Sequence, residues 1–252
     1  MESFKGKSVL VTGGGSGIGK ATALLLGQAG ANVTVSDLKG GAAEDVAQVI
    51  VAAGGTAQGV AVDVSNEDQV EKMVGQAIDA YGRLDGAANC AGFPQHSVRA
   101  HELTLEQWNR CIAVNLTGAF LCAKYELQAM MEVGGGAIVT VASTAATRGF
   151  PLASEYAASK AGLLGFVRCA ACEYGPLGIR INVVLPGGTD TPMLRGKMDE
   201  VPGLEALIAQ QHMLRRFAQP IELGHAIRWL LSDEASFVTG VVFPVDGGQT
   251  AG

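Results

Sequence analysis

The strongest constraint on the fold is an alternation of short apolar runs with helix-like stretches along the chain. The apolar runs are rich in Val, Ile and Ala, which is typical of strands in a sheet buried on both faces. They cover Ser8–Thr12, Asn32–Ser36, Gln58–Val62, Leu84–Ala88, Ala137–Val141, Arg180–Val184 and Val241–Pro244. Helical patterns lie between them, at Gly17–Ala29, Ala42–Ala53, Asn66–Tyr81, Leu105–Met131, Ser154–Gly175 and Ile221–Ser232. This alternation predicts an α/β fold with a doubly wound parallel sheet flanked by helices.

The length and composition of the chain permit that fold in one domain, and they disfavour nucleic acid binding and insertion into a membrane. A chain of 252 residues with 48% hydrophobic residues suits a single α/β domain with a large core. The net charge of −6, with no basic cluster beyond Arg215-Arg216, disfavours nucleic acid binding. No apolar run approaches the about 18 residues of a membrane span, and no signal peptide is visible. We therefore expect a cytoplasmic protein with reduced cysteines and with no membrane or nucleic acid partner.

The first predicted strand runs into the glycine-rich turn Thr12–Gly19. Its glycines form a G-x-x-x-G-x-G pattern, which differs from the G-x-G-x-x-G of larger dehydrogenases. Glycine lets the backbone approach a ligand closely, and the next helix N-terminus offers N–H groups to a pyrophosphate. Because ligands of doubly wound sheets bind beyond the carboxyl ends of the strands, the turn predicts a dinucleotide site. The residues assigned to this site are Gly13, Ser16, Gly17, Ile18 and Gly19.

Polar residues also follow the second, third and fourth predicted strands. Asp37 lies 20 residues beyond Gly17, a spacing typical of the carboxylate that binds the adenosine ribose. A carboxylate there would repel the 2′-phosphate of NADP, so Asp37 predicts NAD as the cofactor. We interpret Lys39, the nearest cation, as a solvated turn residue. Asp63 and Asn89 are candidates for the adenine and for the cofactor wall, although each alone is better explained as a loop-start residue.

Three residues after the fifth strand predict the chemistry. Tyr156 and Lys160 are four residues apart and share one face of a helix. A free phenol has a pKa of about 10, and a nearby ammonium or an oxidised nicotinamide favours its ionised form. Ser143 is placed to hydrogen-bond a substrate oxygen. The pattern predicts hydride transfer between a nicotinamide and a secondary alcohol or ketone, with Tyr156 as acid/base. Such chemistry needs no Lewis acid and the histidines lack metal-ligand spacing, so we expect no metal.

The order and spacing of these motifs resemble the short-chain dehydrogenase/reductase family over essentially the whole chain. The matching segments are Thr12–Gly19, Asp63-Val64, Asn89–Gly92, Asn115, Ser143, Tyr156–Lys160, Pro186-Gly187, Thr191 and Asp246–Gly248. The resemblance implies a Rossmann-type fold with a seven-stranded sheet in a single NAD-binding domain, residues 1–252, with a substrate-binding region at about 186–215. Cys90 stands where the family more usually has Asn.

The resemblance also implies roles for individual residues. It gives a catalytic tetrad of Asn115, Ser143, Tyr156 and Lys160, in which Asn115 holds a water in a proton relay behind Lys160. Lys160 would also bind the nicotinamide ribose, and the segment from Pro186 to Thr191 would hold the carboxamide. The cofactor residues beyond the glycine turn are Asp37, Asp63, Val64, Asn89, Ala91, Gly92, Tyr156, Lys160, Pro186, Gly187, Thr189 and Thr191.

Two other functions compete with an NAD-dependent alcohol dehydrogenase. A 3-oxoacyl carrier-protein reductase would prefer NADPH and need a basic patch for its acidic carrier, which Asp37 and the net charge disfavour. A non-catalytic nucleotide-binding sensor or scaffold would have no physical need to keep Ser143, Tyr156 and Lys160 together.

The sequence leaves the substrate open among a steroid, a cyclic alcohol, a sugar and an aryl ketone. The substrate pocket is expected between the segments Phe93–Val98, Thr144–Leu152 and Met193–Met213. These segments contribute Phe93, Phe150, Leu152, Met193, Leu194, Leu204 and Leu207, which predict an apolar pocket.

The helical stretches Leu105–Met131 and Ser154–Gly175 carry too many small and apolar residues for two solvated faces. A face of this kind predicts an interface. The family resemblance implies that these helices pair across a two-fold axis and that the C-terminal region adds a second contact, giving a homotetramer.

Overall fold

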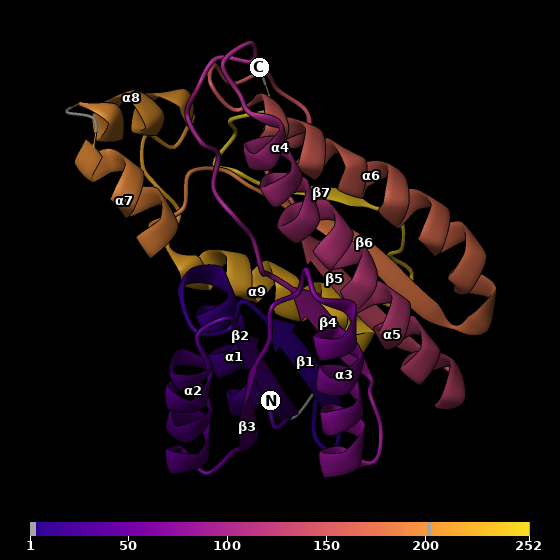
Figure 1. The fold of residues 1–252 in the computed structure, drawn as a ribbon. Coiled ribbons are helices and arrows are strands. Elements are labelled where there is room, and N and C mark those ends of the chain that lie inside the picture. Colours follow the sequence, from indigo (N-terminus) through magenta and orange to yellow (C-terminus); the bar gives the residue numbers. More distant parts are fainter. Residues whose placement is uncertain (1–3, 201–202, 252) are drawn as a thin grey trace.

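The computed structural model describes residues 4–200 and 203–251. Within them, seven parallel strands form one sheet in the order β3-β2-β1-β4-β5-β6-β7 (Figure 1). The strands are β1 (Ser8–Thr12), β2 (Asn32–Asp37), β3 (Thr56–Ala61), β4 (Gly86–Asn89), β5 (Gly136–Val141), β6 (Ile179–Pro186) and β7 (Val242–Val245). The predicted doubly wound, seven-stranded Rossmann-type sheet is confirmed.

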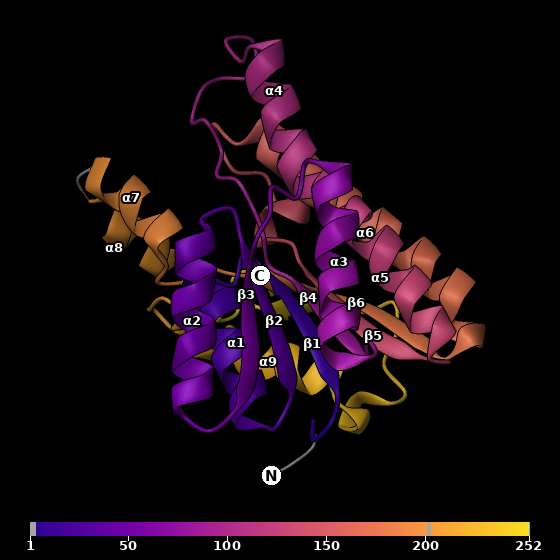
Figure 2. The same cartoon turned by 60° about the horizontal axis from the view of Figure 1, so that its bottom comes forward.

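Helices cover both faces of the sheet, and the sheet divides the core into two layers (Figure 2). One layer contains α1 (Gly17–Gln28), α2 (Gly40–Ala52) and α9 (Pro220–Leu231); the other contains α3 (Glu67–Tyr81), α5 (Ala119–Glu132) and α6 (Ser154–Tyr174). Because successive side chains of a strand point to opposite faces, Val9 and Val11 of β1 join the first layer and Leu10 joins the second. All three side chains are fully buried, so both faces of β1 are covered.

The stretch Leu105–Met131, predicted as one continuous helix, has an irregular middle. It consists of α4 (Leu105–Ile112), a π-helical segment (Ala113–Gly118) and α5. A π turn widens the helix locally and is common at functional sites. Here it contains the buried Asn115, whose side chain binds the backbone of Phe93 in another segment. Apolar periodicity continues through the π turn, so the pattern could not reveal it.

Two helices between β6 and α9 were not predicted. These are α7 (Pro192–Glu200) and α8 (Leu204–Gln211), in the region expected to be a substrate-binding loop. No side chain of α8 is buried, so the helix lacks the buried stripe that apolar periodicity detects. The starts of β3 and β4 also differ by two residues from the predicted starts at Gln58 and Leu84.

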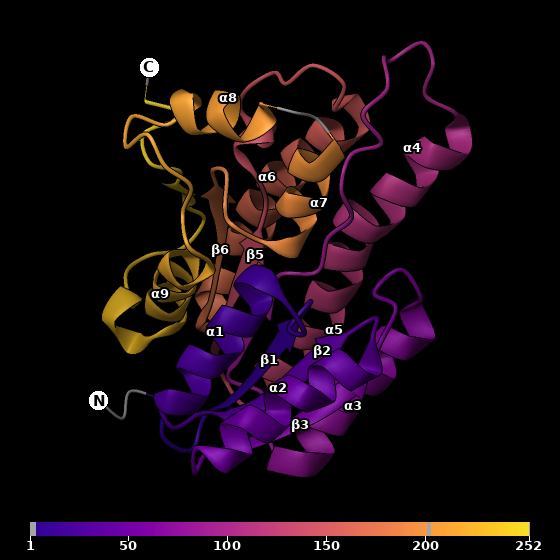
Figure 3. The same cartoon turned by 90° about the vertical axis from the view of Figure 1, so that its left-hand side faces the viewer.

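The sheet order places a crevice at the carboxyl ends of the strands. The order reverses between β1 and β4, and such a switch point is where doubly wound sheets bind ligands. α7, α8 and the C-terminal tail gather at this same end of the molecule (Figure 3). In the ranges 4–200 and 203–251, no helix combines the length and apolar character needed to cross a bilayer.

Candidate active site

A cavity of about 780 Å³ lies at the carboxyl ends of the strands. Its walls come from the glycine turn, from the ends of β2, β4, β5 and β6, and from α6, α7 and α8. This volume is within the range of about 300–1,000 Å³ that small-molecule sites occupy. The cavity therefore joins the predicted dinucleotide site to the predicted substrate site.

The glycine turn packs too closely to the neighbouring backbone to carry side chains. A Cβ added to Gly13 would lie 2.8 Å from the backbone of Ala91, and one added to Gly19 would overlap the Gly13 carbonyl. Ser16 precedes α1 without capping it through its side chain, and no acidic residue occupies the first turn. The N–H groups at the start of α1 are thus available, and this end of the cavity fits a pyrophosphate.

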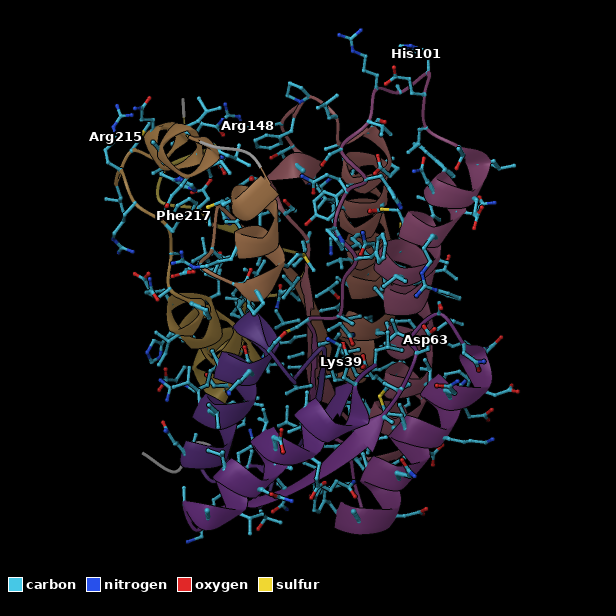
Figure 4. The ribbon with its side chains drawn as sticks, turned by 60° about the vertical axis from the view of Figure 1, so that its left-hand side comes forward. Lys39, Asp63, His101, Arg148, Arg215 and Phe217 are labelled. Atoms are coloured by element: carbon cyan, nitrogen blue, oxygen red, sulfur yellow. The ribbon has the colours of Figure 1, made fainter. Side chains whose placement is uncertain are left out.

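Asp37 is fixed beside the turn at the end of β2. One carboxylate oxygen accepts the Gly15 N–H at 3.0 Å, and the other accepts the Lys39 N–H at 3.0 Å. Each carboxylate oxygen can accept further hydrogen bonds, so Asp37 remains able to bind hydroxyl groups. The exposed Lys39, labelled in Figure 4, also lines the cavity.

Three of the predicted cofactor residues do not line the cavity. Asp63 accepts hydrogen bonds from the Ser65 hydroxyl at 2.6 Å and the Ser65 N–H at 2.9 Å, and the hydroxyl bond is the main cause that lowers the pKa of Asp63. Val64 is buried, and the Asn89 amide donates to Glu126 at 2.8 Å inside the protein. The sequence therefore predicted that these three residues lie at the ends of strands, but it did not predict the direction of their side chains.

The candidate catalytic side chains come together from β5 and α6. Ser143 follows β5, its hydroxyl accepts the Ala145 N–H at 3.1 Å, and it lies close enough to the Tyr156 phenol to lower the pKa of that phenol. Lys160 lies one turn after Tyr156, with its Nζ 5.8 Å from the centre of the phenol ring. That Nζ donates to the Val141 carbonyl at 2.9 Å. All three side chains line the cavity.

Burial dominates the titration of this cluster. It raises the pKa of Tyr156, against a smaller lowering by the hydrogen bond with Ser143, and it lowers the pKa of Lys160 to about 8. The expectation that Lys160 lowers the phenol pKa is therefore not met within the protein alone. The physical reason is that desolvation of the phenol is the larger effect, while the Lys160 amine is held by Val141. Positive charge brought into the cavity by a ligand would favour the phenolate.

Asn115 supports this cluster from behind the cavity wall. Its amide accepts the Phe93 N–H at 2.7 Å and donates to the Phe93 carbonyl at 3.0 Å and to the Ser159 hydroxyl at 3.3 Å. A Cβ on Gly92 would lie 3.4 Å from Asn115 Oδ1 and 3.7 Å from Lys160 Nζ. Asn115 and Lys160 therefore both lie next to Gly92, so the fold gathers all four residues of the predicted tetrad.

The structure adds polar residues that the sequence did not single out. The buried His212 accepts the Gly188 N–H at 2.9 Å through Nε2 and so positions the segment after β6. Glu155, fully buried beside Tyr156, accepts the His96 N–H at 2.8 Å and so ties the segment after β4 to α6. Gln249 reaches the cavity from the C-terminal tail. Isolated polar residues have no periodicity or motif by which a single sequence could reveal them.

The seven apolar residues predicted for the substrate pocket all line the cavity. Polar side chains at this end are few: Gln95, Thr144, Gln211 and Gln249. In the described part of the chain, no group of three or more His, Cys, Asp or Glu side chains is arranged to hold a metal ion.

A buried polar network connects the glycine turn to α5. The Thr12 hydroxyl accepts the Ala91 N–H at 3.3 Å and donates to the Asn89 amide oxygen at 3.5 Å. The Asn89 amide donates in turn to Glu126, whose other oxygen has no hydrogen-bond partner among the described residues. Burial raises the pKa of the Glu126 carboxyl to about 8.

This carboxyl should make stability depend on pH. Between about pH 4.5 and 8 the unfolded chain loses the Glu126 proton while the native state keeps it, so the free energy of unfolding falls as pH rises. One pKa unit corresponds to about 1.4 kcal/mol, so the total fall is a few kcal/mol. Glu126→Gln should remove this slope in urea unfolding from pH 5 to 8.5. Glu71→Gln, at an exposed position of α3, controls for the loss of one charge. Parallel slopes in wild type and Glu126→Gln would contradict the prediction.

The comparison with known proteins covers nearly the whole chain. Residues 13–250 match a family model described as enoyl-(acyl carrier protein) reductase. The chain is 45% identical over 252 residues to 2,5-dichloro-2,5-cyclohexadiene-1,4-diol dehydrogenase of Sphingobium indicum, with 100% of both chains covered. It is 42% identical over 250 residues to cis-4-hydroxycyclohexanecarboxylate dehydrogenase of Sinomonas cyclohexanicum, with 99% of each covered. It is also similar to the crystal structure of levodione reductase, with a TM-score of 0.95, 35% identity and coverage of 98% of this chain and 99% of the other.

Proposed function

The chain belongs to the short-chain dehydrogenase/reductase family, and from that premise we propose that it is an NAD-dependent dehydrogenase of a secondary alcohol on a six-membered carbon ring. The family and its relatives establish an oxidoreductase acting on CH–OH groups. The observation that carries the finer proposal is the single cavity that joins Asp37 to the Ser143–Tyr156 pair and then to apolar walls.

The residues around the cavity fit a dinucleotide. The uncapped start of α1 and the glycine turn would hold the pyrophosphate, and Asp37 would accept hydrogen bonds from the adenosine ribose. At the other end, Lys160 and Thr191 would hold the nicotinamide riboside. Bound NAD⁺ supplies the acceptor for the hydride that leaves the carbinol carbon.

The protein's own groups would handle the proton. The Ser143 hydroxyl holds the substrate oxygen, and the Tyr156 phenolate takes the hydroxyl proton as the carbonyl forms. In the reverse direction the Tyr156 phenol returns that proton to the oxygen. Lys160 lies next to Gly92 with Asn115, so a water held by Asn115 would carry the proton onward from Lys160. The overall change converts an alcohol and NAD⁺ to a ketone, NADH and a proton.

The ring in the substrate is inferred from the relatives and the cavity together. The names of both curated relatives describe oxygen-bearing six-membered carbocycles. The substrate end of this cavity is walled by Phe93, Phe150, Leu152, Met193, Leu194, Leu204 and Leu207. Such walls favour a compact hydrocarbon ring over a sugar, whose many hydroxyls would be left without partners.

The name of the matching family model raises the competing acyl carrier protein function. A carrier protein is acidic, and the net charge of −6 provides no excess of basic groups to attract it. Asp37 also disfavours the NADPH that such a reductase would use. A purely nucleotide-binding role has no use for Ser143, Tyr156 and Lys160 gathered in one cavity.

A turnover assay tests the proposal. Purified protein with NAD⁺ should oxidise cyclohexanol with a higher kcat/KM than a linear secondary alcohol of the same carbon number, measured by NADH formation. A 3-oxoacyl thioester with NADPH is the comparison for the competing function. Turnover of the thioester alone, or of none of these compounds, would overturn the proposal.

We further propose a homotetramer with two different two-fold interfaces. Phe120 of α5 is 45% exposed and contacts Phe166 of α6 with ring centres 6.0 Å apart, so these helices present aromatic surface. On another part of the chain, Phe237 is fully exposed near the start of β7. Two self-complementary patches per chain close into a tetramer.

Light scattering should therefore report about four times the 25.9 kDa chain mass at micromolar concentration. Phe120→Glu should reduce this to a dimer, because it places a charge in the α5–α6 interface. Val51→Glu, at a similarly exposed position of α2, should leave the tetramer intact. A particle of a single chain would refute the assembly, and a wild-type dimer would refute only one interface.

We also propose that the protein works in the cytoplasm. All five cysteines are free thiols, and Cys169 and Cys172 are exposed on α6. Exposed thiols persist in a reducing compartment.

A further inference from the structure

The substrate end of the cavity contains an amide that the hydride-transfer chemistry does not use. Gln249 lines the cavity, yet only 4% of it is exposed to solvent. It belongs to the C-terminal tail, which lies beside α8 at the carboxyl ends of the strands (Figure 3). A buried polar side chain in a mostly apolar wall needs hydrogen-bond partners, so the partners of Gln249 show which of its polar groups remain for a ligand.

The protein holds this amide in a fixed orientation. Gln249 Oε1 accepts the Thr144 hydroxyl at 2.9 Å, and Nε2 donates to Gln211 Oε1 at 3.0 Å. The backbone carbonyl of Gln249 accepts a hydrogen bond from Arg148, which Figure 4 shows at the same end of the molecule as Arg215. Asp246 accepts the N–H groups of Gly248 and Thr250 at 3.0 and 2.8 Å, which fixes the tail on both sides of Gln249.

Half of the hydrogen-bonding capacity of this amide remains for a ligand. A glutamine amide has two N–H donors and an oxygen that accepts two hydrogen bonds. Among the described residues, Gln249 uses one donor and one acceptor site. The unused N–H and lone pair belong to a side chain that lines the cavity, so they can serve a polar group of the substrate.

The anchors of Gln249 place it relative to the reaction. Thr144 directly follows Ser143, which would hold the reacting oxygen. Gln211 belongs to α8, which together with α7 forms the cover of the cavity. The amide therefore connects the catalytic segment to the cover, at the end of the cavity remote from the glycine turn. A substrate whose first oxygen lies at Ser143 and Tyr156 extends toward this cover.

We propose that Gln249 binds a second oxygen of the substrate, across the ring from the carbon that is oxidised. This inference rests on the proposed function. The names of the two curated relatives describe such compounds, a ring 1,4-diol and a ring carboxylate with a hydroxyl at position 4. The free N–H donates to that second oxygen, and the free lone pair accepts the proton of a second hydroxyl. The preferred substrate class is thus a six-membered ring with a hydroxyl group and, across the ring from it, a second substituent that carries oxygen.

The test compares two substrates that differ in one oxygen. With NAD⁺, wild type should oxidise cis-1,4-cyclohexanediol with a kcat/KM about tenfold above that for cyclohexanol, counted per hydroxyl group. Gln249→Met keeps the length of the side chain without its amide, and it should bring the ratio close to one. Gln95→Met is the matched control, because Gln95 is another glutamine of the same cavity wall.

Cyclohexanol turnover reports on folding and on the proposed function. A wild type that oxidises cyclohexanol without favouring the diol would overturn the inference alone, whereas turnover of neither cyclohexanol nor the diol would remove the proposed function itself. A diol-to-cyclohexanol ratio that falls in Gln95→Met but not in Gln249→Met would assign the second oxygen to Gln95. That result would also overturn the inference. If Gln249→Met does not fold, Thr144→Val decides the matter, since it removes only the hydroxyl that orients the amide. The ratio should then fall several-fold, and an unchanged ratio would reject the inference.

Discussion

Tyr156→Phe should lower kcat for alcohol oxidation by about 10²–10⁴-fold, because it removes the group that takes the substrate proton. The aromatic ring stays in place, so NAD binding should be retained. Steady-state kinetics measure kcat, and a titration of the protein with NADH followed by fluorescence measures cofactor binding. The rate of the wild type should also rise with pH, since the phenolate is the active form and burial raises the pKa of Tyr156.

The control for this substitution lies on the same helix. Tyr174→Phe makes the identical change at the end of α6, outside the cavity lining, and should keep the wild-type rate. Retention of half the turnover in Tyr156→Phe would remove the proposed mechanism. A wild-type rate that stays flat from neutral to alkaline pH, with chemistry limiting turnover, would also count against a phenolate base.

Asp37→Ala should have the second-largest effect, on the choice of cofactor. In the wild type we expect NAD to exceed NADP by at least about 10²-fold in kcat/KM. The Asp37 carboxylate lies beside the glycine turn, where a 2′-phosphate of roughly −1.5 to −2 charge would be repelled by a few kcal/mol. Removing it should reduce the ratio at least tenfold, by weakening NAD and improving NADP.

Lys39 provides the control for the cofactor prediction. It is exposed, lines the same cavity and donates its backbone N–H to Asp37, so Lys39→Ala changes a neighbouring charge while keeping that hydrogen bond. The NAD preference should persist in Lys39→Ala. Equal use of both cofactors by the wild type would mean that Lys39 or another cation reaches the phosphate, and Asp37 would then not set the preference.

The sheet was predictable from the sequence because its strands are buried on both faces. A fully buried strand such as β1 must be apolar throughout, and every predicted run corresponds to a strand of the structure. α7 and α8 were missed because they cover a cavity instead of packing into a core layer. The π turn around Asn115 was missed because apolar periodicity continues through it, and the hydrogen bond of Asn115 with Phe93 joins segments that are separate in the sequence.

The site was predictable wherever a residue's position along a strand or helix determines its direction. The spacing of Tyr156 and Lys160 fixes a common helix face, and both line the cavity. For Asp63 and Asn89 the position was predictable but the direction of the side chain was not, because hydrogen bonds with Ser65 and Glu126 decide that direction. Gln249 could not be found from sequence, since only the fold brings the C-terminal tail to Thr144.

The sheet order has a consequence for how the chain reaches its native state. Strand β1 is made first, yet it pairs with β4, and the paired residues Thr12 and Asn89 are 77 positions apart. During synthesis β1, β2 and β3 can associate early, but β1 then remains an unpaired edge until β4 has emerged. Closing so long a loop before its contacts form slows folding. Strand β1, which lies between β2 and β4 in the finished sheet, is therefore an unpaired edge open to aggregation while the protein is being made.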